Sequence, residues 1–376
     1  MTKKHNIKNV LYIGNYLENY SRNYIFINNL RNNGINVYEI NLQNKGKLEI
    51  IKFFIRNFKK LRKKDYDLII FFSFRFSISF LFAKILSMMR KVPLVNDIFI
   101  SKLLSFYYDY NLANVRIRNL PKILYWLQYY FFDWIECWLS NYIILDTFSH
   151  INYFHKKFNI PIKKFRKIYV GARDDIFYPM EKRKESGDKF IVGFWGTFIP
   201  LHGIEYIIRA AKKLEQNHEI EFMLIGTGTT YSRNRKLAED LQVKNIKFIP
   251  KNFLDINEFA KLRELISQFD VGLGIFGTTE KSSLAIPNKI FEGIAMNIPM
   301  ITRDSPAIRE LFVNGENICL CLPGNPESLA ESILYLKENL QLREKIKREG
   351  YKLFKDFCSI KAIGRKLLMT LKNIVN

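Results

Sequence analysis

Short apolar runs alternate along the chain with longer segments whose apolar residues recur every three or four positions. The runs predict strands buried on both faces, and the longer segments predict helices that cover them. Six runs lie in the first half, at residues 9–16, 35–42, 67–74, 92–99, 141–148 and 165–172. Six more lie in the second half, at residues 190–198, 219–229, 245–250, 270–277, 297–304 and 317–323. Repeated strand–helix–strand units predict α/β domains with doubly wound parallel sheets and right-handed crossovers.

A boundary between two such domains is predicted at residues 172–189, where the alternation stops. This segment is charged and contains Pro179, as is common for interdomain linkers. We therefore expect an N-terminal domain over residues 1–180, a C-terminal domain over 181–350 and a last helical segment over 351–376.

Basic residues outnumber acidic ones, with 59 Lys and Arg against 36 Asp and Glu, which gives a formal net charge of +23. Such an excess attracts polyanions, namely nucleic acid, an anionic membrane or phosphorylated small molecules. The abundance of Asn, Lys, Ile, Phe and Tyr is also typical of an AT-rich genome, so codon bias is an alternative explanation. The sequence has no zinc-finger, RNA-recognition or helix-turn-helix signature, which argues against a nucleic-acid-binding protein.

The four cysteines lie among apolar neighbours, and Cys319 and Cys321 would share one face of a strand. No CxxC and no His-rich segment accompanies them, so we expect buried free thiols and no zinc site. The chain starts without the apolar segment of a signal peptide, and its longest apolar stretch, residues 76–89, is too short to span a bilayer. We expect a cytoplasmic protein that is soluble or lies on the membrane surface.

The strand-like run at residues 190–198 leads into a loop with candidate chemistry. Gly196 and Thr197 follow the apolar residues, and His202 and Gly203 open a helix. Small residues let backbone NH groups approach an anion, and a helix N-terminus adds its positive end. These residues are suited to a diphosphate site, although an ordinary strand-to-helix turn with a surface histidine explains the same letters.

A second polar segment leads into a helix that starts near Pro287, and Asn288, Lys289 and Glu292 fall in its first turns. Lys289 can stand as a point charge beside a phosphate. Glu292 can accept two hydroxyl groups of a ribose, as a carboxylate does in dinucleotide-binding folds. The alternative is a solvated Lys–Glu pair that stabilises its own helix.

Taken together, these segments resemble glycosyltransferase family 4 of the GT-B superfamily over nearly the whole chain. The similar motifs are residues 193–203, residues 223–231 with Gly226 and Gly228, and residues 286–310. Residues 145–179 resemble the approach to the family's linker. The resemblance implies two Rossmann-like domains that face a central cleft, with C-terminal helices that cross back towards the N-terminal domain.

The resemblance also implies a reaction. A sugar would move with retention of configuration from a nucleotide-diphosphate donor to a glycan or lipid-linked acceptor, in cell-surface polysaccharide or glycolipid synthesis, without a metal or other cofactor. Donor contacts would come from Gly196, Thr197, His202, Gly203, Gly226, Gly228, Ile286, Asn288, Lys289 and Glu292.

The chain departs from the family pattern at two places. Many members have two glutamates in the donor motif, and the earlier position is Leu284 here. Contacts to the sugar hydroxyls would then come from Glu280 or from backbone NH groups of the loop Ser282–Ile286. Thr197 and His202 stand where many members have Arg and Lys in the phosphate loop. The diphosphate site is then less charged, and Lys289 becomes more important for binding. A non-catalytic nucleotide-sugar binder is the alternative that Leu284 raises; a GT-B epimerase or phosphorylase fits the motifs less well.

Candidates for the acceptor side lie in the first half. Asp97, Asp146 and His150 follow strand-like runs, and we expect Asp97 and His150, with Lys289, to take part in the reaction. Helix capping by Asp97 and packing of His150 inside a helix are the alternatives. Asn15 and Arg22 follow the first strand, where Arg22 is suited to an anionic acceptor.

Two further patterns bear on metal and membrane. Asp65 and Asp67 match an Asp-x-Asp motif, but they precede a strand, so we expect a solvated strand start and no metal. Residues 50–64 form a basic amphipathic segment, and an aromatic run follows Lys122. Both are suited to peripheral contact with an anionic membrane. The alternative is a crossover helix whose apolar stripe packs on its own sheet.

Overall fold

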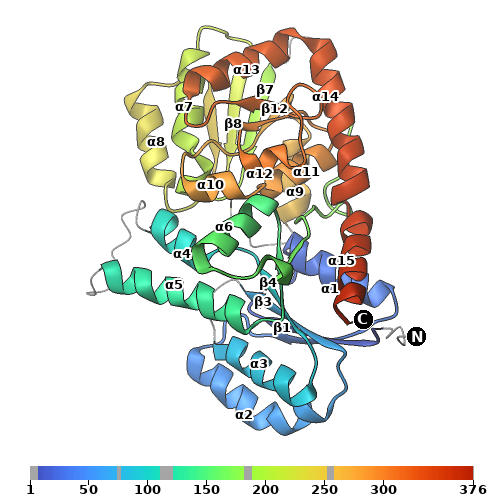
Figure 1. Cartoon of the computed structure of the whole chain (residues 1–376). Helices are drawn as coiled ribbons and strands as arrows, with labels where there is room; N and C mark the ends of the chain where they lie inside the picture. Colours follow the sequence, from blue (N-terminus) through green and yellow to red (C-terminus); the bar gives the residue numbers. More distant parts are fainter. Residues whose placement is uncertain (1–6, 74–77, 111–121, 182–188, 252–257, 376) are drawn as a thin grey trace. The chain divides into compact units, whose positions relative to one another are not determined.

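The computed structural model describes residues 7–73, 78–110, 122–181, 189–251 and 258–375. The chain divides into two compact units (Figure 1). The first comprises residues 1–107, 117–170 and 360–376, and the second comprises residues 108–116 and 171–359. Each unit is built around a six-stranded sheet whose strands are all parallel, and all twelve predicted strands are present.

The sheet of the first unit has the order β2-β1-β3-β4-β5-β6. Its strands are β1 Asn9–Gly14, β2 Asn36–Asn41, β3 Leu68–Ser73, β4 Leu94–Ile98, β5 Tyr142–Leu145 and β6 Phe165–Lys167. Its helices are α1 Ser21–Asn32, α2 Lys47–Lys63, α3 Ile78–Arg90, α4 Lys102–Ser105, η1 Phe106–Tyr110, α5 Lys122–Leu139, α6 Phe148–Phe158, η2 Ile162–Lys164 and α15 Ile360–Val375.

Alternate residues of these strands pack into cores on opposite faces of the sheet. Val10 and Ile70 pack with α1 and with the last helix, α15. Leu11 and Ile69 pack with α2 and α3 on the other face. A strand with helices on both faces has no side for water, which explains why its sequence is an unbroken apolar run.

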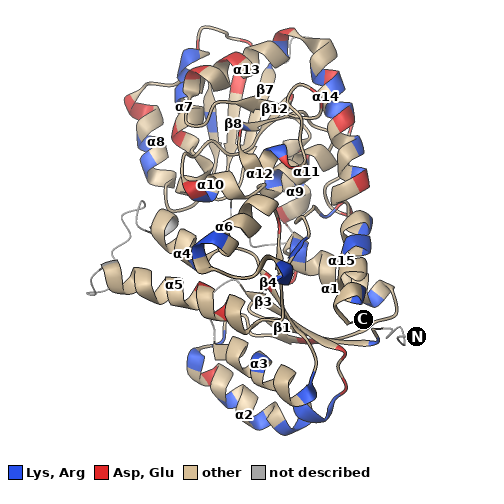
Figure 2. Ribbon diagram, viewed as in Figure 1, with Lys and Arg blue, Asp and Glu red and all other residues tan. Residues whose placement is uncertain are grey.

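The apolar stripe of α2 packs against its own domain. Ile50, Phe54 and Leu61 are buried in the core beneath the helix, and the ring of Phe54 stacks on Phe82 of α3 at 4.3 Å between centroids. The crossover-helix interpretation of this stripe is therefore correct, and the side of α2 that stays exposed is the basic one (Figure 2). No described helix is long and apolar enough to cross a membrane.

The sheet of the second unit has the order β12-β11-β10-β7-β8-β9. Its strands are β7 Phe190–Trp195, β8 Ile220–Ile225, β9 Ile246–Ile249, β10 Val271–Leu273, β11 Met300–Arg303 and β12 Cys319–Cys321. Its helices are η3 Pro200–His202, α7 Ile204–Lys213, α8 Tyr231–Asp240, α9 Glu258–Ile266, α10 Glu280–Leu284, α11 Asn288–Ala295, α12 Pro306–Arg309, α13 Pro326–Glu338, α14 Leu340–Leu353 and η4 Phe354–Cys358.

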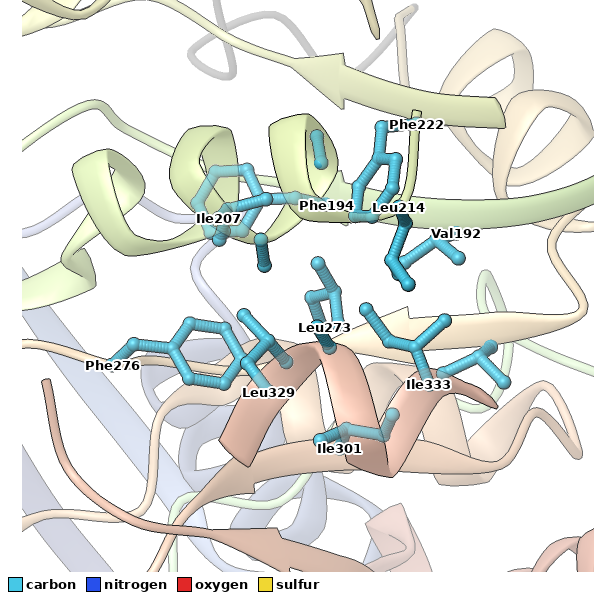
Figure 3. Packing of buried hydrophobic residues seen from close by; sticks show 14 of the residues in the cluster. Val192, Phe194, Ile207, Leu214, Phe222, Leu273, Phe276, Ile301, Leu329 and Ile333 are labelled. Carbon is cyan, nitrogen blue, oxygen red and sulfur yellow. The ribbon is translucent and has the colours of Figure 1, made fainter. Parts of the chain in front are cut away.

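One face of this second sheet packs against α7 and α13. Figure 3 shows Val192, Phe194, Leu273 and Ile301 from the strands among Ile207, Leu214, Leu329 and Ile333 from the helices. Cys319 and Cys321 join this core from one side of β12, as their spacing predicted, and both are free thiols. This packing fixes the carboxyl ends of β7, β10 and β11, from which the candidate site is built.

Candidate functional site

Lys289 is the second residue of α11, and its side-chain nitrogen lies deep in the second unit. The residue is only 4% exposed, and its Nζ lies 3.9 Å from the centroid of the Phe194 ring. A Cβ atom placed on Gly196 would lie 3.1 Å from the same nitrogen. Among the residues that the structure describes, this Nζ has no hydrogen-bond partner. Buried polar groups are normally hydrogen-bonded, so a buried lysine nitrogen without a partner indicates a site for an anionic ligand.

The loop after β7 brings Gly196 and His202 to this lysine. Gly196 has a φ of +139°, a conformation that side-chain-bearing residues rarely adopt. His202 is buried, and its Nδ1 hydrogen-bonds to the carbonyl of Thr197. Burial and the charge of Lys289 hold the pKa of His202 well below its usual value. The neutral imidazole thus uses its Nδ1 proton to brace the loop, and its other nitrogen has no proton to donate to a phosphate.

The glycines after β8 let the two loops of the site lie against each other. A Cβ on Gly228 would come within 2.5 Å of the backbone oxygen of Phe198. The Phe198 NH donates to the Thr227 carbonyl at 2.9 Å, and the Thr230 NH donates to the Phe198 carbonyl at 3.0 Å. In this structure the segment around Gly228 therefore supports the β7 loop through its backbone.

Glu292 lies one turn after Lys289 on α11 and is held by a tryptophan. Its Oε2 accepts a hydrogen bond of 2.7 Å from Nε1 of Trp195, the last residue of β7. Among the described residues the Glu292 carboxyl group makes no second hydrogen bond, so its Oε1 is available to another donor. Burial raises the pKa of Glu292, while the hydrogen bond from Trp195 and the charge of Lys289 oppose the rise.

A third part of the site lies at the carboxyl ends of β10 and β11. Arg303, the last residue of β11, donates to the Gly277 carbonyl and, at 2.6 Å, to the hydroxyl of Ser282. The Thr279 side chain caps α10, whose first residue, Glu280, is exposed. Ile286 is buried, and Asn288 opens α11. Sequence reasoning missed Arg303 and Trp195, and their positions at strand ends were the available signal.

In the first unit, Arg22 and Asp97 form a buried ion pair. Arg22 Nε lies 2.8 and 2.9 Å from the two carboxylate oxygens of Asp97, and Arg22 Nη1 donates to the Ile168 carbonyl at 3.0 Å. Both side chains are at most 1% exposed. Asp97 lies inside β4, and Ser101 caps the next helix, so the interpretation of Asp97 as a helix cap was wrong.

Asp146 and His150 form a second pair at the same edge of this sheet. Asp146 follows β5, and its Oδ1 lies 2.9 Å from Nδ1 of His150. Thr147 caps α6 by accepting a bond from the His150 NH at 3.0 Å. Asn15 is exposed after β1. Of the predicted residues on the acceptor side, Asn15 and Asp146 thus follow strands of one sheet, while Asp97 of β4 and Arg22 of α1 are paired with each other.

The first unit also contains a buried polar network that sequence reasoning missed. Lys102 Nζ lies 2.7 Å from Glu136 Oε2 and 3.5 Å from Asp133 Oδ1, and it donates to Ser73 at 2.8 Å. Ser101 donates to the other oxygen of Asp133 at 2.6 Å. The network ties α5 to the end of β3 and the start of α4.

The Asp-x-Asp motif has a structural role. Asp67 accepts bonds from the backbone NH groups of Lys8 at 2.6 Å and Asn9 at 2.8 Å, and Asp65 pairs with Arg90. Across the described residues, no group of three or more His, Cys, Asp or Glu is placed to hold a metal ion. The motif therefore joins the starts of neighbouring strands.

Comparison with known proteins places these motifs in a family. Residues 179–353 match the family described as "Glycosyl transferases group 1". Over 190 residues the chain is 27% identical to the uncharacterized glycosyltransferase MJ1178 of Methanocaldococcus jannaschii, which covers 50% of this chain and 48% of that protein. Over 242 residues it is 26% identical to EpsD of Bacillus subtilis, whose name also assigns it to the glycosyltransferases, with 60% and 59% covered. The chain thus spans about half to three fifths of the curated relatives it matches.

Solved structures share the fold at low identity. Alr3699/HepE of Anabaena, crystallised with UDP and glucose, superposes with a TM-score of 0.69 at 15% identity, covering 97% of this chain and 99% of that one. Sucrose-phosphate synthase of Thermosynechococcus elongatus superposes with a TM-score of 0.74 at 13% identity, with 97% and 98% covered. The two parallel six-stranded sheets have the GT-B architecture of these structures, and residues 179–353 are similar to the glycosyl transferases group 1 family.

Proposed function

We propose that this chain is a retaining glycosyltransferase that moves a sugar from a nucleoside diphosphate donor to a glycan or lipid-linked acceptor, in the synthesis of a cell-surface polysaccharide or glycolipid. The observation that carries the proposal is the unpaired, buried side-chain nitrogen of Lys289 beside Gly196, one helical turn from Glu292. An anion with a ribose attached would satisfy both side chains at once. The complexes of Alr3699/HepE with UDP and with UDP-glucose support this choice of ligand class.

Each donor contact follows from an atom that is free to make it. Lys289 Nζ binds the diphosphate, with the backbone NH of Thr197 as a further donor, since the Gly196 NH already donates to the Ile225 carbonyl at 3.0 Å. Glu292 accepts ribose hydroxyls at Oε1, while Trp195 holds Oε2 and thereby orients the carboxylate. As the bond to the sugar breaks, negative charge develops on the diphosphate, and the preorganised lysine and backbone dipoles stabilise that charge. No metal ion is required in this scheme.

On the acceptor side, the proposal uses the Asp146–His150 pair. The Asp146 carboxylate fixes the imidazole with its proton on Nδ1, which leaves Nε2 to accept a hydrogen bond from an acceptor hydroxyl. Arg22 is removed from the candidates for binding an anionic acceptor, since all its hydrogen bonds go to Asp97 and Ile168. Asp97 is likewise engaged, and we assign both residues to the support of the sheet edge.

Calorimetric titration with UDP, GDP, CDP and ADP, with and without EDTA, tests the donor proposal. We expect saturable binding of one nucleotide, with an affinity that EDTA leaves unchanged. The Glu292→Gln variant checks the location, because its amide oxygen can still accept from Trp195 but binds ribose hydroxyls more weakly. Loss of one charge-assisted hydrogen bond costs about 1.5–3 kcal/mol. Binding that disappears with EDTA and returns with manganese would contradict the metal-free mechanism, and folded protein that binds none of the four would contradict the donor site.

A second part of the proposal concerns a membrane partner. The helix α5 exposes large apolar side chains, namely Ile123, Leu124, Leu127, Phe131 and Trp138. Helix α5 packs on the same face of the first sheet as α2. Ile143, in the core beneath α5, lies in register with Asn96 and, through it, with Phe71, in the core beneath α2 and α3. Residues in register on parallel strands point to the same face. The exposed side of α2 is strongly basic (Figure 2). We propose that this face contacts an anionic membrane, with charge from α2 and apolar contact from α5.

Changing Lys59, Lys60, Arg62 and Lys63 together to glutamine is expected to weaken binding to phosphatidylserine-containing vesicles. All four side chains are exposed on α2. At about 1 kcal/mol per basic residue the loss is about 4 kcal/mol, measured by vesicle co-sedimentation. The matched control changes four exposed basic residues of the second unit, Arg233, Lys236, Lys345 and Lys352, to glutamine. Equal losses in the two variants would show that net charge, and not this face, attracts the membrane.

A further inference from the structure

We propose that the second unit takes up one proton for each nucleoside diphosphate that it binds, and that Lys289 receives this proton. The inference rests on the proposed donor site and adds a property of it: free protein holds Lys289 as a neutral amine, and bound protein holds it as an ammonium. Binding of the donor would then be linked to pH through one identified residue.

The surroundings of Lys289 offer little to a charged amine. The ring of Phe194 covers its Nζ, and the backbone of Gly196 and the imidazole edge of His202 border it. None of these groups is a carboxylate or a free carbonyl positioned for a hydrogen bond, and within the described residues Nζ has no partner. A buried ammonium here would lose its hydrogen bonds to water without gaining any from the protein, so the uncharged amine is favoured.

The titratable groups that face Lys289 do not reverse this balance. On its own helix, Glu292 favours the charged amine, but the acid makes no ion pair with it and its Oε2 is held by Trp195. His202 of η3 is near enough to Lys289 that a positive charge on either side chain disfavours a positive charge on the other. The charge of Lys281 of α10 also lowers the pKa of His202. Burial is the largest effect and, with only Glu292 opposing, sets the pKa of Lys289 well below its usual value.

A diphosphate beside Gly196 changes the sign of the environment. Two anionic phosphate groups next to Nζ favour the ammonium, so the pKa of Lys289 in the complex returns towards the ordinary value of about 10.4. Between the lowered pKa and this restored value, binding therefore takes up a proton. Through that window the affinity falls as pH rises, by about tenfold per pH unit for one linked proton, and below the window it is constant.

Two other groups could supply a proton-linked signal, and both are separable. The terminal phosphate of a nucleoside diphosphate titrates with a pKa of about 6, so at about pH 8.5 it is fully ionised and silent. His202 donates its Nδ1 proton to the Thr197 carbonyl, and a protonated Lys289 would disfavour a positive charge on the His202 ring. Neither group accounts for proton uptake in alkaline solution.

The test is calorimetry with UDP, GDP, CDP and ADP at about pH 8.5 in buffers of low and high ionisation enthalpy, such as phosphate-free HEPES and Tris. The dependence of the binding enthalpy on the buffer counts the protons taken up. We expect about one in the original protein. We expect about zero in Lys289→Arg, whose guanidinium is charged in both states and still binds the nucleotide.

The outcomes separate this inference from the proposed function. Nucleotide binding with no buffer dependence overturns the proton linkage and leaves the donor site standing. Uptake that persists in Lys289→Arg places the proton on another group and also overturns the inference. Failure of all four nucleotides to bind folded protein overturns the donor site and this inference with it.

Discussion

Replacing Lys289 by methionine is expected to weaken nucleoside diphosphate binding by about 1.5–3 kcal/mol, or about ten- to hundredfold, without destabilising the free protein. The binding loss follows from removing the charged donor at Gly196. Stability is kept because the side chain is buried without a partner, and methionine of similar volume removes a polar group that burial disfavours. Calorimetry gives the affinity, and denaturant unfolding gives the free energy of unfolding.

Lys102 provides the matched control for this experiment. It is also 4% exposed, but Glu136, Asp133 and Ser73 surround its ammonium group. Lys102→Met leaves two buried carboxylates without their cation, so we expect a loss of about 3–5 kcal/mol of stability. Similar stability losses in the two variants would show that Lys289 is a structural residue, and would contradict its assignment to the donor site.

Arg22→Met is expected to cost about 3–5 kcal/mol in the free energy of unfolding of the first unit. The change leaves Asp97, which is fully buried, without the guanidinium that now contacts both of its oxygens. Three of the four tryptophans, Trp126, Trp134 and Trp138, belong to this unit, so tryptophan fluorescence in a denaturant titration reports mainly on it.

The double variant Arg22→Met/Asp97→Leu separates a buried unpaired charge from lost packing. We expect it to recover most of the stability, since replacing both partners of a buried ion pair by apolar residues is often neutral. Nucleotide affinity should be unchanged in the folded single variant, because the donor residues lie in the second unit. A stability loss below about 1 kcal/mol in Arg22→Met would mean that Asp97 can be neutralised at little cost, and that the pair does not hold the sheet edge.

Tertiary structure reassigned residues that the sequence had placed in function. Arg22 had the charge that an anionic acceptor needs, but its partner, Asp97, lies 75 positions along the chain. A charged residue in a sequence carries no mark of whether its counter-ion is a ligand or a distant side chain. The same limit applies to α2, whose apolar stripe fitted both a membrane surface and the core of its own domain. The stacking of Phe54 on Phe82 shows that this stripe packs in the core.

The sequence by itself determined the strands, the two parallel sheets and the resemblance to glycosyltransferases, because these depend on local patterns: unbroken apolar runs, glycines at strand ends, and motifs of fixed spacing. Only the tertiary structure decided which polar residues are satisfied within the protein and which are left for a ligand. Lys289 and Lys102 are equally buried lysines, and what distinguishes them is the set of atoms within 4 Å of each nitrogen. Those atoms come from strands and helices far apart in sequence, so the difference arises when the chain folds.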